Sequence, residues 1–148
     1  MAQKDDFDLQ NFLPYLLNQA AEESSLKFQQ IYKDRYGMLR TEWRVLFHLG
    51  IYGRMTASDI GARSKMHKTK ISRAVQKLAE RRFLVRDRDN ADRRQEYLEL
   101  TTAGQTAYRG LRSIAQGYDA QLEQELSGSE SDILRRALRK LAGIPEGR

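Results

Sequence analysis

Cysteine is absent from the 148-residue sequence, which excludes disulfide bonds, cysteine-ligated metal sites and thiol-based redox sensing. No apolar run approaches the roughly 18 residues that a membrane-spanning helix needs. The first ten residues, MAQKDDFDLQ, are acidic and lack the apolar core of a secretory signal. We therefore expect a soluble, cytoplasmic protein with no membrane partner.

The residue patterns of catalytic and metal sites are missing as well. His48 is one of two histidines, and no second histidine, cysteine or pair of carboxylates accompanies it at ligand spacing. The chain shows no nucleophile–base pair and no glycine-rich loop that would cradle phosphates. We expect no metal, no cofactor and no enzymatic activity.

Positive charge is abundant and concentrated in one stretch. The whole chain carries 26 Lys and Arg against 20 Asp and Glu, a net charge of +6. Residues 54–94 hold thirteen of the basic residues and five of the acidic ones, so this stretch carries +8 and the remainder −2. A local basic stretch is typical of a surface that binds a polyanion.

Before this stretch, the sequence predicts two helices. Apolar residues recur every three or four positions from Phe12 and support a long helix to about Arg35, with Asp8 or Asn11 as its N-cap and Pro14 in its first turn. Its stripe fits either one side of the core or a subunit interface. A short buried helix follows, with Thr41 as its N-cap and Gly53 at its end.

The basic stretch begins with the pattern of a helix-turn-helix. Thr56 and Asp59 have the spacing of a capping box, which predicts a helix over 57–63. Residues 64–66 form the turn, and a second helix follows from about His67 to Arg82. Its buried stripe has the amphipathic spacing i, i+3, i+4 and i+7: Ile71, Ala74, Val75 and Leu78.

The other face of this second helix is cationic and polar, and no acidic residue lies between His67 and Gln76. A solvated helix face usually mixes charges, because like charges repel and form no i,i+4 pairs. Lys and Arg bind guanine edges, and Ser and Thr bind bases or phosphates. The face therefore suits a DNA major groove.

Two short strands, 83–86 and 95–100, are predicted next. The polar loop between them, 87–94, mixes arginines with three aspartates and forms a wing with the strands. Narrow minor grooves attract inserted arginines. The aspartates oppose DNA, so we expect them to pair with and orient the neighbouring arginines.

The remaining chain is helical in pattern. A helix starts at Thr101 or Thr102, and Ser127-Gly-Ser129 interrupts the periodicity. Ser129 is the expected N-cap of a last helix, which Gly143 and Pro145 end. The apolar stripes at both ends of the chain exceed what a winged module needs, and interleaving with a second copy would cover them.

These motifs resemble the multiple-antibiotic-resistance regulator (MarR) family of winged helix-turn-helix transcription factors. Asp92-Arg93-Arg94, followed after five residues by Leu100-Thr101, fits the D-x-R-x5-L-T wing signature of that family. Residues 71–78 resemble its recognition helix, and residues 43–46 resemble its second helix.

The resemblance implies a mainly α fold with a small β-wing, in one compact domain over about residues 8–143. It implies a homodimer in which residues 1–35 and 102–148 form the dimerisation region and residues 36–101 form the DNA-binding region. Arg82 departs from the family, because many relatives have glycine there. If this position has a positive φ, arginine costs about 1 kcal/mol.

The resemblance also assigns site residues. The recognition helix would offer Lys68, Thr69, Lys70, Ser72 and Arg73 to DNA, with Lys77 on the same face. The wing would offer Arg88, Arg93 and Arg94, with Asp92 as their brace. Relatives often release DNA when a small aromatic acid binds, and the candidate pocket residues are Tyr15, Tyr36, Arg40, Trp43, Arg44 and His48. Each of these six also suits plain packing or surface exposure.

The sequence thus indicates a transcriptional regulator that binds double-stranded DNA. We expect a homodimeric repressor of a pseudo-palindromic operator, released by a small aromatic acid. The alternative is an architectural protein that binds DNA or RNA through the same face without sequence preference.

Overall fold

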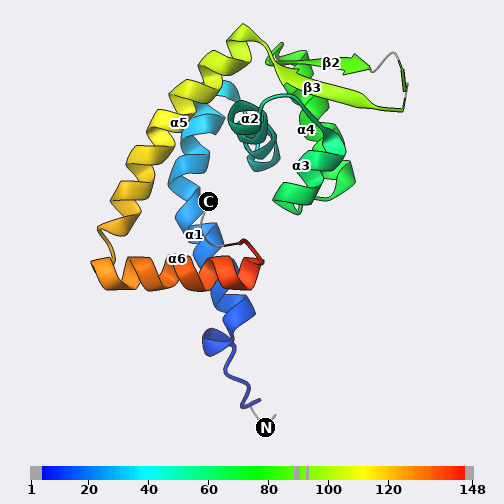
Figure 1. Cartoon of the computed structure of the whole chain (residues 1–148). Coiled ribbons are helices and arrows are strands. Elements are labelled where there is room, and N and C mark those ends of the chain that lie inside the picture. Colours follow the sequence, from blue (N-terminus) through cyan, green and yellow to red (C-terminus); the bar gives the residue numbers. More distant parts are fainter. Residues whose placement is uncertain (1–4, 89–90, 93, 146–148) are drawn as a thin grey trace. The chain divides into compact units, whose positions relative to one another are not determined.

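The computed structural model describes residues 5–88, 91–92 and 94–145. It confirms the predicted mainly α fold with a small sheet (Figure 1). The helices and strands are η1 (Leu9–Asn11), α1 (Leu13–Tyr36), α2 (Arg40–Tyr52), β1 (Met55–Thr56), α3 (Ala57–Ser64), α4 (Lys68–Glu80), β2 (Leu84–Arg88), β3 (Glu96–Leu100), α5 (Thr102–Glu123) and α6 (Gly128–Ala142). The chain divides into two compact units, 1–108 and 109–148, and the division lies inside α5.

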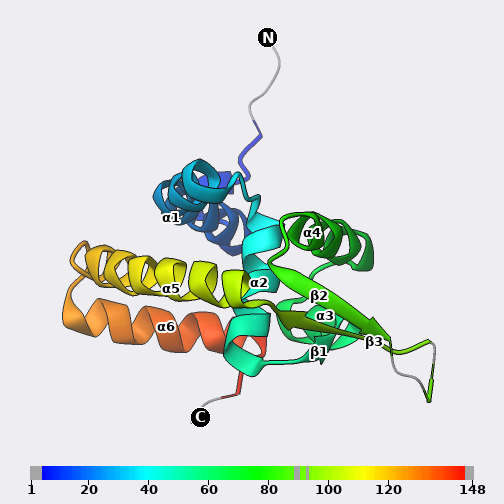
Figure 2. The same ribbon diagram turned by 90° about the horizontal axis from the view of Figure 1, so that it is seen from above.

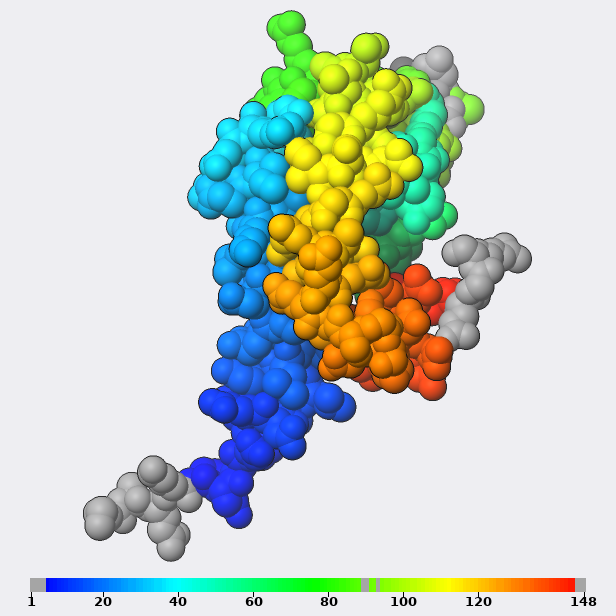
Figure 3. Space-filling model, turned by 90° about the vertical axis from the view of Figure 1, so that its left-hand side faces the viewer, coloured from blue at the N-terminus to red at the C-terminus, as the bar shows by residue number. Residues whose placement is uncertain are grey.

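Helix α1 is long, as predicted, but its cap differs from the prediction. Phe12 is the N-cap, with Pro14 in the first turn. Asp8 is instead the N-cap of the short helix η1, and Asn11 is its last residue. The helix ends at Tyr36, where Gly37 adopts a left-handed φ of 62°. Several apolar side chains of the N-terminal segment, drawn in blue in Figure 3, are exposed: Leu9, Phe12, Leu13 and Leu16.

Helix α2 provides much of the core of the first unit, and its predicted N-cap, Thr41, was wrong. The helix starts two residues earlier than predicted, with Leu39 as its N-cap, because the carboxylate of Glu42 accepts the Leu39 N–H at 2.9 Å. Val45, Leu46 and Leu49 are almost fully buried. The helix packs against α4, α3 and β3, all in the first unit.

The helix-turn-helix forms where the sequence predicts it. The Thr56 hydroxyl accepts the Asp59 N–H at 3.1 Å, and the Asp59 carboxylate accepts the Thr56 N–H at 3.3 Å, so the capping box is confirmed. Helix α3 extends to Ser64, and Lys65 turns the chain with a φ of 59°. Figure 2 shows α3 and α4 beside the sheet.

Arg82 has a φ of 62°, so the departure from glycine falls at a position where a left-handed residue is required. The Arg82 N–H bonds to the Ala79 carbonyl and the Phe83 N–H to the Leu78 carbonyl, both at 2.9 Å. These two bonds form a Schellman motif that ends α4 and turns the chain into β2.

We expect Arg82→Gly to raise the free energy of unfolding by about 1 kcal/mol, because glycine adopts this conformation without steric cost. Denaturant unfolding followed by circular dichroism measures the change. Arg35→Gly is the matched comparison, since it removes the same charge from a helical position where glycine is unfavourable. Equal or lower stability of Arg82→Gly would contradict the strain argument.

The sheet has three antiparallel strands in the order β1-β3-β2. The predicted strand 83–86 is β2, shifted to Leu84–Arg88, and Arg86 pairs with Leu98 of β3. The two-residue strand β1 was not predicted, because its length carries no alternation. It joins the opposite side of β3 through Met55–Leu98 and Thr56–Tyr97.

Thr101 joins the sheet to α5. Its hydroxyl donates to the Arg82 carbonyl at 2.7 Å and accepts the Gly104 N–H at 3.1 Å. One side chain therefore fixes the turn after α4 and caps α5. Gly104 lies so close to the chain that a Cβ atom there would be 2.0 Å from the Phe83 carbonyl oxygen.

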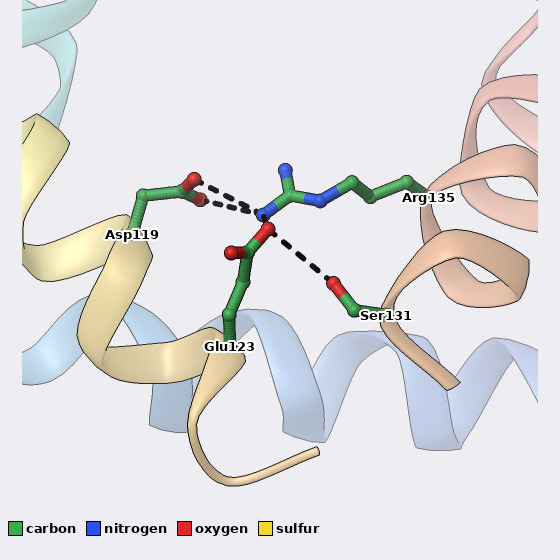
Figure 4. A network of polar contacts seen from close by, with 4 residues as sticks. All are labelled: Asp119, Glu123, Ser131 and Arg135. Atoms are coloured by element: carbon green, nitrogen blue, oxygen red, sulfur yellow. Dashed lines mark hydrogen bonds and ion pairs between the residues drawn. The ribbon is translucent and has the colours of Figure 1, made fainter. Parts of the chain in front are cut away.

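In the second unit, α5 and α6 are joined by ion pairs (Figure 4). Arg135 bonds to Asp119 at 3.0 Å and to Glu123 at 2.6 Å, and these hydrogen bonds raise the pKa of its guanidinium. The N-cap of α6 is Ser127, so the prediction of Ser129 was wrong. Glu130 completes the capping box with Ser127, and a hydrogen bond from the Ser127 N–H lowers the pKa of its carboxyl.

The apolar face of α6 is exposed, with Ile133 at 61% and Leu141 at 62%. Within the described part of the chain, no helix has the length and apolar character needed to cross a membrane.

Candidate nucleic-acid interface

Helix α4 separates an apolar face from a cationic one. Ile71, Ala74, Val75 and Leu78 are buried, as the periodicity predicts. The predicted recognition residues all lie on the exposed face: Lys68, Thr69, Lys70, Ser72, Arg73 and Lys77. No acidic residue lies in the first turn, where the free N–H groups already favour an anion. The face can therefore contact phosphates and base edges at once.

His67 begins this helix. Its Nδ1 atom accepts the Thr69 N–H at 3.2 Å, so the ring acts as the N-cap. An accepting Nδ1 carries no proton, which leaves Nε2 as the donor. The imidazole thus completes the first turn of α4 and remains exposed beside Lys68.

The base of the wing is braced by ion pairs. Arg54 pairs with Asp87 at 2.9 Å and lies over the Tyr97 ring, 4.6 Å from its centroid. Arg86 pairs with Glu96 on the neighbouring strand at 3.0 Å. These contacts hold β2 and β3 in register and use Arg54 and Arg86 within the protein.

Near the wing tip, Asp92 bonds to both the backbone N–H of Arg94 at 3.0 Å and its Nε at 3.4 Å. The Arg94 side chain is 94% exposed. Arg88 ends β2, opposite Glu96. Arg93 and Asp89 lie outside the described residues, so their predicted places in the wing stay predictions.

A hollow of about 470 Å³ lies between the first turn of α3 and the base of the wing. Its lining includes Ser58 and Arg94, together with Thr56 and Tyr97. The first turn of a helix presents unpaired N–H groups, and Arg94 adds a positive charge. The carboxylates of Asp59 and Glu96 also line the hollow, and the Asp59 N–H is already bonded to the Thr56 hydroxyl, so its lining has mixed charge.

The candidate ligand residues form a cluster only in part. The Trp43 ring stacks on Tyr32, with centroids 6.1 Å apart, and meets Phe28 edge to face at 5.4 Å. Burial raises the pKa of the Tyr32 phenol, and a hydrogen bond from Arg40 and the charge of Arg44 oppose this shift. Arg40 also pairs with Glu22 at 3.2 Å.

Two of the other three candidates pack against other rings. Tyr36 packs on Phe83 at 5.6 Å, and His48 packs on Tyr52 at 5.9 Å while its Nδ1 contacts the Arg44 carbonyl at 2.6 Å. Tyr15 lies in the first turn of α1. The structure thus brings Arg40, Trp43 and Arg44 together around Tyr32, which the sequence did not single out as a pocket residue.

Two charged residues of importance were missed. Glu42 is 2% exposed, and Arg81 places its Nε 3.6 Å from the Glu42 carboxylate. They are 39 positions apart, in the first turn of α2 and directly after α4, and no sequence pattern indicates that they are in contact. Among the described residues, no group of three His, Cys, Asp or Glu side chains is arranged to bind a metal.

Comparison with known proteins agrees with this geometry. The MarR family model matches residues 36–95, which span α2, the helix-turn-helix and most of the wing. No match was found among curated protein sequences.

Several solved structures resemble the chain. A MarR/EmrR family transcriptional regulator from Acinetobacter sp. ADP1 is 26% identical, with a TM-score of 0.82 over 93% of this chain and 96% of that one. Bordetella bronchiseptica BpsR, solved in work on regulation of its DNA binding by 6-hydroxynicotinic acid, is 21% identical, with a TM-score of 0.83 over 93% and 98%. S. aureus MepR, solved as a DNA complex, is 21% identical, with a TM-score of 0.78 over 89% and 97%. Residues 36–95 thus match the MarR family model, and the chain shares the winged helix-turn-helix fold of MarR family transcriptional regulators.

Proposed function

We propose that the protein is a cytoplasmic homodimeric repressor that binds a pseudo-palindromic operator and releases it when a small aromatic acid binds. The observation that carries the DNA-binding part is the exposed cationic face of α4, which stands opposite a fully buried apolar face. S. aureus MepR, which shares the fold, was solved as a DNA complex.

The dimer is supported by exposed apolar side chains at both ends of the chain. In the first unit they lie on η1 and the first turns of α1, and in the second unit they lie on α6. Water contact with so many large apolar side chains is unfavourable, and a second copy of the chain would cover them. Each copy then reads one half-site, with half-sites about 10 bp apart.

The aromatic-acid part is supported by the cluster around Tyr32. The Trp43 Nε1 atom is buried and has no hydrogen-bond partner among the described residues. With the guanidiniums of Arg40 and Arg44 beside the same tyrosine, the cluster offers a donor and positive charge among aromatic rings. DNA binding by Bordetella bronchiseptica BpsR is regulated by 6-hydroxynicotinic acid.

Footprinting on the intergenic DNA next to the gene tests the proposal. We expect protection of two half-sites about 10 bp apart, a strong loss of affinity with added salt, and release by members of a panel of aromatic acids. Equal affinity for this DNA and for random duplexes would instead support the architectural alternative. Activation of the promoter by the bound protein in a transcription assay would contradict repression.

A further inference from the structure

Arg81 lies directly after the recognition helix, yet its guanidinium binds protein groups. Nη1 donates to the Tyr36 carbonyl, and Nη2 donates to the Gly37 carbonyl at 3.0 Å. Nε lies 3.6 Å from the Glu42 carboxylate. All three partners lie between the end of α1 and the first turn of α2, in residues 36–42, which we term the α1–α2 corner.

The corner is built to receive this guanidinium. Gly37 has a φ of 62°, and a Cβ atom there would lie 3.3 Å from Nη2 of Arg81. The Glu42 carboxylate uses Oε2 for the Leu39 N–H, and its buried Oε1 has no hydrogen-bond partner among the described residues. A buried carboxylate oxygen needs a compensating charge, and Arg81 provides the nearby positive charge.

The contacts of Arg81 with the α1–α2 corner fix the orientation of α4. Apolar packing of α2 against α4 is non-directional, whereas a guanidinium that binds two carbonyls and faces a carboxylate fixes an orientation. The 13 residues of α4 extend about 20 Å at 1.5 Å per residue. Arg81 holds the end of α4 that is remote from Lys68 and Lys70, so a tilt of roughly 5° at Arg81 displaces that far end by more than 1 Å. A displacement of this size is enough to misplace groups that must meet base edges.

We propose that Arg81 is a positioning residue. It fixes the recognition helix to the α1–α2 corner and so sets operator affinity without touching DNA, and its bonds to the corner link the Trp43–Tyr32 cluster to the DNA-binding face. The proposal rests on the proposed DNA-binding function. Arg81 is then not one of the basic residues that contact DNA. It acts within the protein, whereas its exposed cationic neighbours bind the duplex.

For the Glu42→Gln variant, electrostatic attraction and positioning by Arg81 predict opposite changes in operator affinity. The change removes a negative charge, so attraction to phosphates alone would strengthen binding to every duplex. Positioning predicts the reverse for the operator, because a glutamine has one acceptor oxygen, so its NH2 group must face either Arg81 or the Leu39 N–H. We expect the operator Kd to rise about tenfold, a coupling of ordinary size, while the Kd for a random duplex stays equal or falls.

Arg81→Gln should weaken operator binding by a similar factor, and the double variant should lose no more than either single variant, because both break one interaction. Arg35→Gln is the matched control, since it removes one positive charge from an exposed position near the same corner. Its effect on both duplexes should be less than about twofold. Tighter operator binding by Glu42→Gln, or additive losses in the double variant, would overturn the proposal.

Trp43 is the single tryptophan and adjoins Glu42, so its emission reports on the corner. Operator DNA should change this emission in the wild-type protein, and Arg81→Gln should abolish the change at saturating DNA. An equal response in both proteins would refute the link to the corner. If Arg81→Gln does not fold, as judged by circular dichroism, Arg81→Lys replaces it, because lysine keeps the charge and loses the planar fork. A wild-type protein that shows no operator preference would instead refute the proposed function.

Discussion

Replacing Gly104 by alanine is expected to lower the free energy of unfolding by about 3 kcal/mol, at the upper end of what overpacking causes. The new Cβ atom would lie 2.0 Å from the Phe83 carbonyl oxygen and 2.9 Å from its carbonyl carbon. Both atoms belong to the backbone and cannot rotate away as a side chain can. The same oxygen accepts the Thr101 N–H at 3.0 Å, so a shift that relieves the clash also strains that bond.

Thermal unfolding at a fixed protein concentration measures this effect, which should lower Tm by roughly 10 °C for a chain of this size. Gly117→Ala is the control. Gly117 lies within α5 and has open space around its Cα, so alanine should stabilise the helix by about 0.5–1 kcal/mol. If Gly104→Ala melts at the wild-type temperature, the close approach of α5 to Phe83 is wrong.

Alanine at Lys70 or Arg73 is expected to reduce operator affinity by about 1–3 kcal/mol each, or roughly 5- to 150-fold. Both side chains are exposed on the cationic face of α4, so folding should be unchanged. Base recognition requires a donor at a fixed place in the groove, and truncation removes it. Binding to random duplexes should fall much less, because it depends on the summed charge of the whole face.

Gel shifts with the operator and a scrambled duplex, repeated over a range of salt concentrations, separate the two effects. Loss of one phosphate contact lowers the salt slope by about 0.9, whereas loss of a base contact lowers selectivity. Lys33→Ala is the control, because it removes the same charge from an exposed position in the last turn of α1. Equal losses on both duplexes would show that Lys70 and Arg73 bind phosphates and read no bases.

The sequence was sufficient for the helix-turn-helix and its exposed face, because amphipathic periodicity records burial directly. Helix ends were less predictable. Ser127 and Ser129 both precede an acidic residue three positions later, so spacing alone did not distinguish them, and the structure has Ser127 as the cap. At α2, the glutamate that reaches back to Leu39 displaced the more conventional cap at Thr41.

Hydrophobic periodicity does not predict contacts between residues that are far apart in the sequence. Arg81 counts as one more positive charge in the sequence, and only the fold brings it to Glu42. The strand β1 has two residues and is defined by its pairing with β3. The left-handed conformation of Arg82 was predictable, because many members of the resembling family have glycine at this position.

The two outer strands of the small sheet also protect it against self-association. On one side, β1 offers only two residues to an approaching strand, too few for a stable ladder. On the other side, the free edge of β2 carries exposed Arg86, Asp87 and Arg88. Charged edges discourage pairing with another strand. Two copies of the chain are therefore protected from joining edge to edge through their sheets.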